Sequence, residues 1–182
     1  MRYLILSILL ANCAGNVAIK PDIKKSWPNA DWQQEVYKRV QDMPKVSDGK
    51  EFCPNGMTPE NWVHLLSAVA YYESGYSPAK VYREKFRNGR GELILSTGLF
   101  QISYEQSRHR DYGYPRVTTE QLKDPITNID IAVKIAKRIV GGNGVVTNHS
   151  GSSWKGMARA WSVMRPSGKL SQIKARMREH CQ

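Results

Sequence analysis

The sequence lacks the clusters of histidine and cysteine that usually hold a metal ion. Its four histidines are scattered along the chain, and its three cysteines form no Cys-x-x-Cys pair. Protein zinc sites place such ligands at short, regular spacings, so we expect no metal centre. Internal repeats and low-complexity tracts are also missing. A chain of 182 residues without them suits one domain with a hydrophobic core.

Acidic residues are scarce relative to basic ones. The chain has 27 lysines and arginines against 16 aspartates and glutamates, which gives a formal net charge of +11. Such a surface attracts polyanions, among them nucleic acid, anionic lipid and an acidic cell wall. Because no nucleic-acid-binding motif is present, we expect no nucleic-acid partner.

Residues 1–13 have the features of an export signal. The apolar run from Tyr3 to Ala11 is too short to span a bilayer but suits the core of a signal peptide. The segment Leu10-Ala11-Asn12-Cys13 resembles a bacterial lipobox, with asparagine where glycine, alanine or serine is usual. Lipidation of Cys13, which would give a lipid anchor, and ordinary cleavage close to it both stay open. We expect a periplasmic, outer-membrane-anchored or secreted protein.

Cys53 and Cys181 remain in the folded part of the chain after either form of processing. In an oxidising compartment these two cysteines could form one disulfide that ties the start of the domain to its end. The alternative is two unrelated thiols, and only their geometry decides between the two.

Hydrophobic spacing and turn residues predict a mostly helical α+β fold with one small β-hairpin. Helices are expected at 32–40, 58–75, 124–142, 152–164 and 169–178. The turn dipeptides Asn88-Gly89 and Arg90-Gly91 lie between two β-prone runs and predict the hairpin within 81–96. We expect residues 14–57, a tether, a helix and a loop, to pack on a domain at 58–182.

Glu73 is a carboxylate on the apolar stripe of the helix that begins at Thr58. It lies four residues after Val69, seven after Leu66 and eleven after Trp62, so its side chain should point inward. Burial raises the pKa of a carboxyl group, and a carboxylic acid still protonated near neutral pH can act as a general acid. Cleavage of a glycosidic bond requires such an acid. A partly buried structural glutamate would show the same spacing.

Three motifs resemble those of soluble lytic transglycosylases and goose-type lysozymes. They are Glu73-Ser74-Gly75-Tyr76, Gly98-Leu99-Phe100-Gln101-Ile102, and Asp124-Pro125 followed by Asn128-Ile129, in the order of these families. The resemblance covers residues 59–165 and implies a lysozyme-like domain. It also implies an enzyme, expected to be a monomer without a cofactor. Its reaction would be cleavage of peptidoglycan glycan strands at the β-1,4 bond between N-acetylmuramic acid and N-acetylglucosamine.

The resemblance also implies a role for single residues. Glu73 becomes the catalytic acid and base, and Gly98 lets the backbone run close to the sugar. The substrate-binding positions are Ser74, Gly98, Phe100, Gln101, Ser103 and Trp161. Phe100 and Gln101 could equally be buried structural residues. Trp161 stands where these families carry a tyrosine, so it could stack on a sugar or belong to the core.

A second carboxylate across the cleft would decide the product of the reaction. Such a group can activate water and favour hydrolysis, whereas its absence favours attack by the 6-hydroxyl of muramic acid and a 1,6-anhydro product. Glu92, six residues before Gly98, is the first candidate, and Glu84 is the alternative. Two other functions stay open, a chitinase-like glycosidase and a catalytically inactive module that binds the cell wall.

Overall fold

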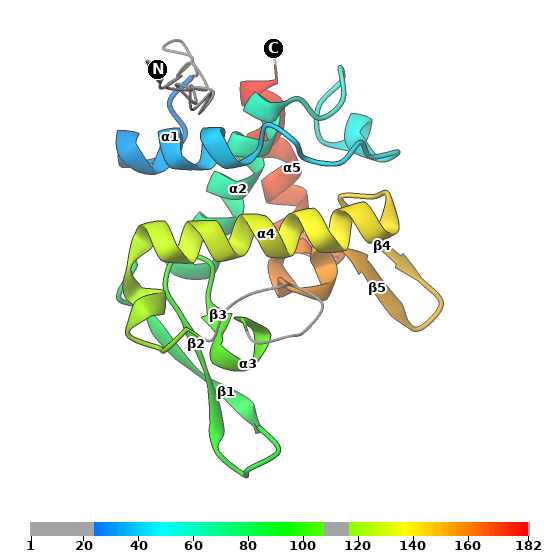
Figure 1. The fold of residues 1–182 in the computed structure, drawn as a ribbon. Coiled ribbons are helices and arrows are strands. Elements are labelled where there is room, and N and C mark those ends of the chain that lie inside the picture. Colours follow the sequence, from blue (N-terminus) through cyan, green and yellow to red (C-terminus); the bar gives the residue numbers. More distant parts are fainter. Residues whose placement is uncertain (1–23, 108–116, 182) are drawn as a thin grey trace, which may run out of the picture.

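The computed structural model describes residues 24–107 and 117–181 (Figure 1). The predicted α+β class, mostly helical, is confirmed. The export signal and Cys13 lie outside the described residues. The helices are α1 (Ala30–Arg39), α2 (Pro59–Ser74), α3 (Tyr104–Ser107), α4 (Pro125–Asn143) and α5 (Gly168–His180). The short 3-10 turns are η1 (Gly49–Glu51), η3 (Gln121–Lys123), η4 (Met157–Arg159) and η5 (Ser162–Met164).

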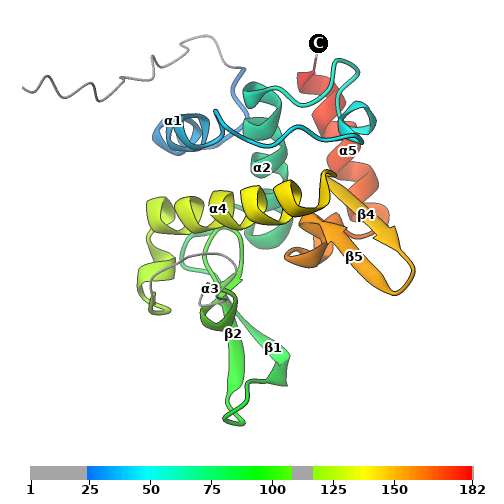
Figure 2. The same cartoon turned by 45° about the vertical axis from the view of Figure 1, so that its right-hand side comes forward.

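The strands form two small antiparallel sheets, and both project from the helical body (Figures 1 and 2). β1 (Val81–Arg87), β2 (Leu93–Thr97) and β3 (Ile102–Ser103) form the first, whose β1–β2 hairpin extends below α4 in Figure 1. β4 (Thr147–Ser150) and β5 (Ser153–Gly156) form the second, beside the C-terminal end of α4. The predicted hairpin within 81–96 is therefore confirmed.

α2 runs through the core, and the local sequence sets both of its ends. The Thr58 hydroxyl accepts a hydrogen bond from the Asn61 backbone N–H, and Pro59 takes the first helical position, where a missing N–H costs nothing. Residues 61–70 are all buried. Gly75 ends the helix in the left-handed conformation, with φ +66°. Glu73 therefore lies on the last turn, where the core meets the surface.

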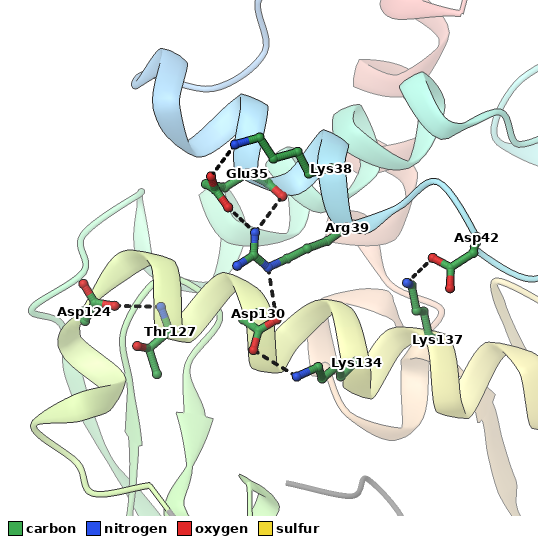
Figure 3. Close-up of polar contacts among 9 residues, drawn as sticks. All are labelled: Glu35, Lys38, Arg39, Asp42, Asp124, Thr127, Asp130, Lys134 and Lys137. Carbon is green, nitrogen blue, oxygen red and sulfur yellow. Dashed lines mark hydrogen bonds and ion pairs between the residues drawn. The ribbon is translucent and has the colours of Figure 1, made fainter. Parts of the chain in front are cut away.

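α1 and α4 pack against each other, and ion pairs join α4 to α1 and to the segment that follows α1 (Figure 3). The Arg39 guanidinium donates to the Asp130 carboxylate over 3.0 Å, and Lys137 pairs with Asp42. These side chains are partly exposed, so each pair contributes at most about 1 kcal/mol. The buried apolar residues of α4, such as Ile129 and Ile135, contribute more through the hydrophobic effect.

α4 begins where the sequence predicts but ends later. The Asp124 carboxylate accepts a hydrogen bond of 2.7 Å from the Thr127 backbone N–H and caps the helix (Figure 3). The helix continues through Gly141 and Gly142 to Asn143, and Gly144 ends it with φ +65°. Gly141 and Gly142 stay in the helical conformation, because glycine permits a helix to end but does not force it to. The helix ends only at Gly144, where the left-handed backbone turns the chain away from the helix axis.

The prediction of a helix at 152–164 is wrong. β5 occupies the first part of this segment, and η4 and η5 occupy the rest. Gly156 lies at φ +57° and ψ −146°, and a Cβ there would overlap the Val146 carbonyl oxygen. The chain must therefore leave β5 in a conformation that no helix contains. The apolar spacing came from Met157, Trp161 and Met164, which the 3-10 turns bury.

α5 is tied to α2 and to the start of the domain. Cys53 and Cys181 form a disulfide with Cα atoms 5.3 Å apart, which confirms the predicted pairing. The rings of His64 and His180 stack with centroids 4.3 Å apart, and burial lowers the pKa of both. The structure thus fixes the two ends of residues 53–181 side by side. In 24–107 and 117–181, no helix combines the length and apolar character needed to cross a membrane.

Candidate active site

A cleft of about 710 Å³ opens between the end of α2, the β1–β2 hairpin and the η4–η5 segment. Its lining combines acidic, aromatic and basic side chains. The acids are Glu73 and Glu84, the aromatic residues are Tyr72, Tyr82, Phe86 and Trp161, and the bases are Lys80, Arg159, Arg165 and Lys169. The walls come from elements that are far apart in the sequence.

Glu73 is half-buried and lines this cleft. Burial raises the pKa of its carboxyl group to about 7. The charges of Lys169 and Lys80 and a hydrogen bond from the Val163 backbone N–H act in the opposite direction, and the charge of Glu84 adds to the rise. Because desolvation is the largest effect, a large fraction of the molecules keep this proton at neutral pH. The group is thus placed to donate a proton to a bound molecule.

Glu84 lines the same cleft from β1. Tyr82, Glu84 and Phe86 alternate along the strand, so they share the face that borders the cleft. The half-buried Glu84 carboxylate accepts a hydrogen bond of 2.6 Å from the Ser96 hydroxyl on β2. The neighbouring strand therefore holds the carboxylate in place, and its charge acts on Glu73.

Glu92 does not line this cleft. Its exposed carboxylate lies in the hairpin turn, where it accepts a hydrogen bond of 2.9 Å from the Asn88 amide and pairs with Arg90 at 3.2 Å. The Asn88 hydrogen bond and the Arg90 charge lower the pKa of Glu92. Contacts within the turn hold the Glu92 side chain away from the cleft. The candidate second carboxylate is therefore Glu84, which the sequence analysis gave as the alternative.

The Gly98 turn is built around the side chain of Asn128. The Asn128 amide donates to the carbonyls of Thr97 and Leu122, and its oxygen accepts from the Phe100 backbone N–H, all within 2.9–3.0 Å. Gly98 has φ +80°, and a Cβ there would overlap both Asn128 and the Leu122 carbonyl oxygen. Gly98 is therefore needed for its contact with Asn128, not for the expected approach to a sugar.

Phe100 and Trp161 belong to the core. Phe100 is fully buried, with its ring against those of Trp27 and Trp161. Trp161 reaches the floor of the cleft but is only 2% exposed, and its indole N–H donates to the Phe100 carbonyl over 3.0 Å. Neither ring has a free face for a sugar, so the structural alternative holds for both.

The remaining expected positions divide into two groups. Ser74 is buried, and its hydroxyl donates to the Ala70 carbonyl, so it does not reach the cleft. Gln101 and Ser103 do line it. The Gln101 amide donates to the Lys80 and Gly98 carbonyls, and the Ser103 hydroxyl accepts from a backbone N–H of α3. Of the expected substrate-binding residues with polar side chains, these two line the cleft.

Sequence analysis missed several residues of the cleft. Tyr82 and Phe86 are 49% and 64% exposed and lie on the same side of the cleft, and a group of exposed apolar rings marks a binding surface. Their period-two spacing with Glu84 on a predicted strand was the available signal. No sequence pattern pointed to the basic residues Arg159 and Lys169, because only the tertiary structure brings them into the cleft with Glu73.

An acid at the end of a buried helix, above a cleft with a β-hairpin wall, defines a lysozyme-like domain. The chain belongs to the transglycosylase SLT domain family, whose model matches residues 54–158. The family suggested by the three sequence motifs is thus confirmed.

Solved structures of one protein, DslA, are similar to this chain. The structure titled "Bd0314 DslA wild-type form 2" is 26% identical with a TM-score of 0.73, and the match covers 84% of this chain and 95% of that chain. A glutamate-to-glutamine mutant of DslA is 27% identical with a TM-score of 0.72, covering 80% and 86%. A second such mutant matches with the same values as the wild type. A comparison with curated proteins gave no significant match.

We expect Gly98→Ala to disrupt the site by displacing Asn128. The new methyl group overlaps the Asn128 amide and the left-handed backbone is strained, so the free energy of unfolding should fall by about 2 kcal/mol or more. Gly91→Ala is the matched control, because Gly91 has φ +78° but open space around its Cβ position. Urea unfolding measures both, and equal losses would contradict a specific role for the Asn128 contact.

Proposed function

We propose that this protein cleaves the β-1,4 bond between N-acetylmuramic acid and N-acetylglucosamine in peptidoglycan, with Glu73 as general acid and base. The observation that carries the proposal is the half-buried Glu73 carboxyl, with a pKa raised to about 7, in the open cleft of a transglycosylase-family domain. Peptidoglycan is the substrate that the family supports, and an acid of this pKa suits the leaving oxygen of a sugar.

The reaction has two proton transfers through one carboxyl group. Protonated Glu73 donates its proton to the oxygen that bridges the two sugars, the bond from this oxygen to C1 of muramic acid breaks, and positive charge develops at C1. The ionised Glu73 then takes a proton from the hydroxyl group that attacks C1. This second transfer restores the acid, so no cofactor is consumed.

The hairpin wall supplies the surface for the sugar rings. Tyr82 and Phe86 present exposed aromatic surface on the same side of the cleft as Glu84. The apolar faces of sugar rings pack well against aromatic side chains, which bury water-exposed carbon on both partners. Gln101 and Ser103 border the same space with polar groups.

Glu84 makes hydrolysis the favoured outcome, so the enzyme acts as a lysozyme. Its carboxylate can accept a hydrogen bond from a water molecule and hold it against C1, while the ionised Glu73 takes the proton that this water releases. Two observations support this assignment. Ser96 holds Glu84 in the cleft, and the glutamates exchanged in the two DslA mutants lie eleven positions apart, the spacing of Glu73 and Glu84.

Glu73→Gln should abolish cleavage while keeping the shape of the side chain. An amide has no proton to donate to the bridging oxygen, so we expect a loss of roughly a thousandfold or more in kcat. Mass spectrometry of digested sacculi measures the products, and Glu92→Gln is the control that should stay active. Cleavage of sacculi by Glu73→Gln would refute the proposal. Cleavage of chitin oligomers but not sacculi by the wild type would favour the chitinase-like alternative.

The pH dependence of kcat/KM should follow the protonation of Glu73. The protonated form is lost as pH rises through about 7, so kcat/KM should fall on the alkaline side of this value. Lys169 lowers the pKa of Glu73, and Lys169→Gln should therefore move this alkaline limb to higher pH. A limb that stays in place, or moves to lower pH, would contradict the assignment.

Glu84→Gln should change the product more than the binding. Without a carboxylate to hold the attacking water, attack by the 6-hydroxyl should account for a larger share of the cleavage events. The fraction of 1,6-anhydro ends should therefore rise. These ends are lighter than reducing ends by the mass of one water molecule, so mass spectrometry separates them. An unchanged product ratio would show that Glu84 does not select water.

A further inference from the structure

One wall of the cleft is basic. Arg159, Arg165 and Lys169 line this side, and Lys155 on β5 extends it beyond the cleft. We call these four residues the basic wall. Among the described residues, no carboxylate forms an ion pair with any of them. Four like charges repel one another, so an anion bound between them would be stabilised.

A second groove of about 450 Å³ meets the cleft at Arg159. It is lined by Asn143, Ser153, Trp154, Lys155 and Arg159, and Arg159 is also part of the cleft lining. The β4–β5 hairpin that carries most of it stands beside η4 in both views (Figures 1 and 2). A molecule held over Glu73 can therefore extend past Arg159 onto this hairpin.

Trp154 gives the second groove an apolar surface next to its charges. The ring lies 4.3 Å from that of His149, and the Arg165 guanidinium lies 5.3 Å from its centroid. These contacts fix both Trp154 and Arg165, which lowers the entropy that either would lose on binding a ligand. An apolar surface bordered by cations suits a peptide that carries carboxylates.

The chemistry of peptidoglycan supplies such a peptide. Its N-acetylated sugars are uncharged, and its carboxylates belong to the stem peptide attached to the lactyl group of muramic acid. We propose that the basic wall binds carboxylates of the stem peptide, and that the peptide runs from the cleft past Arg159 into the second groove. This inference rests on the proposed function, because it assumes a muramic acid residue next to Glu73. Arginine can hold a carboxylate through two parallel hydrogen bonds.

Binding of the peptide would also act on the catalytic acid. Lys169 belongs to the basic wall and lowers the pKa of Glu73. A peptide carboxylate that neutralises Lys169 weakens this effect, so Glu73 keeps its proton to a higher pH. Strands with stem peptides should then be cleaved to a higher pH than bare strands.

The test compares glycan strands with stem peptides and strands from which an amidase has removed them. For the wild type we expect kcat/KM to be about tenfold higher on strands with peptides, the effect of two partly exposed charge contacts. In Lys155→Gln/Arg159→Gln this ratio should fall close to one. The matched control is Lys85→Gln/Arg138→Gln, which removes the same charge from exposed residues outside both grooves and should keep the ratio.

Two results would overturn the inference. One is a wild-type ratio near one, and the other is an equal fall in the ratio for the control variant, which would assign the preference to net charge alone. Calorimetry separates this failure from failure of the proposed function. With Glu73→Gln, a disaccharide that carries a tetrapeptide should bind about tenfold more tightly than the same disaccharide without it. This difference should disappear when Lys155→Gln/Arg159→Gln is added to Glu73→Gln, and it can be measured even if no form cleaves sacculi. Equal binding of the two disaccharides to Glu73→Gln would reject the peptide site.

Discussion

The removal of one carboxyl group from water is the constraint on which the rest of this structure depends. Glu73 lies at the end of a helix whose residues 61–70 are all buried, so the protein around the carboxyl group replaces much of its hydration. Desolvation outweighs Lys169 and Lys80, which would otherwise keep the group ionised. The stability of the core thus offsets the cost of holding an acid protonated in an open cleft.

Two of the motifs that identify the family hold the backbone beneath the cleft in place. Asn128 joins the Gly98 turn to α4 through two hydrogen bonds and binds the Leu122 carbonyl through a third, and Trp161 and Phe100 join the turn to the core. A buried polar network of this kind is stable only when every partner is present. Gly98 and Asn128 are therefore needed to hold the Gly98 turn in position, and the cleft walls are formed by other residues.

The two walls of the cleft differ in their chemistry. The hairpin wall carries Tyr82, Phe86 and Glu84, which suit sugar rings and an attacking water molecule. The opposite wall is basic and continues to Trp154 on the second hairpin. A net charge of +11 by itself indicates only an affinity for polyanions. Under the proposed function, its concentration beside Glu73 places part of that affinity where peptidoglycan carries its carboxylates.

The sequence alone determined the helical α+β class, the ends of α2, the β1–β2 hairpin, the two cysteines available for a disulfide and the inward position of Glu73. These depend on local capping, turn residues and periodicity, which act over a few residues, or on the small number of cysteines. The tertiary structure decided that Glu84 and not Glu92 enters the cleft, that Phe100 and Trp161 are core, and that 152–164 forms a hairpin and 3-10 turns. Each of these outcomes depends on contacts with distant segments, such as Gly156 against Val146, and no local pattern encodes the space that such contacts leave.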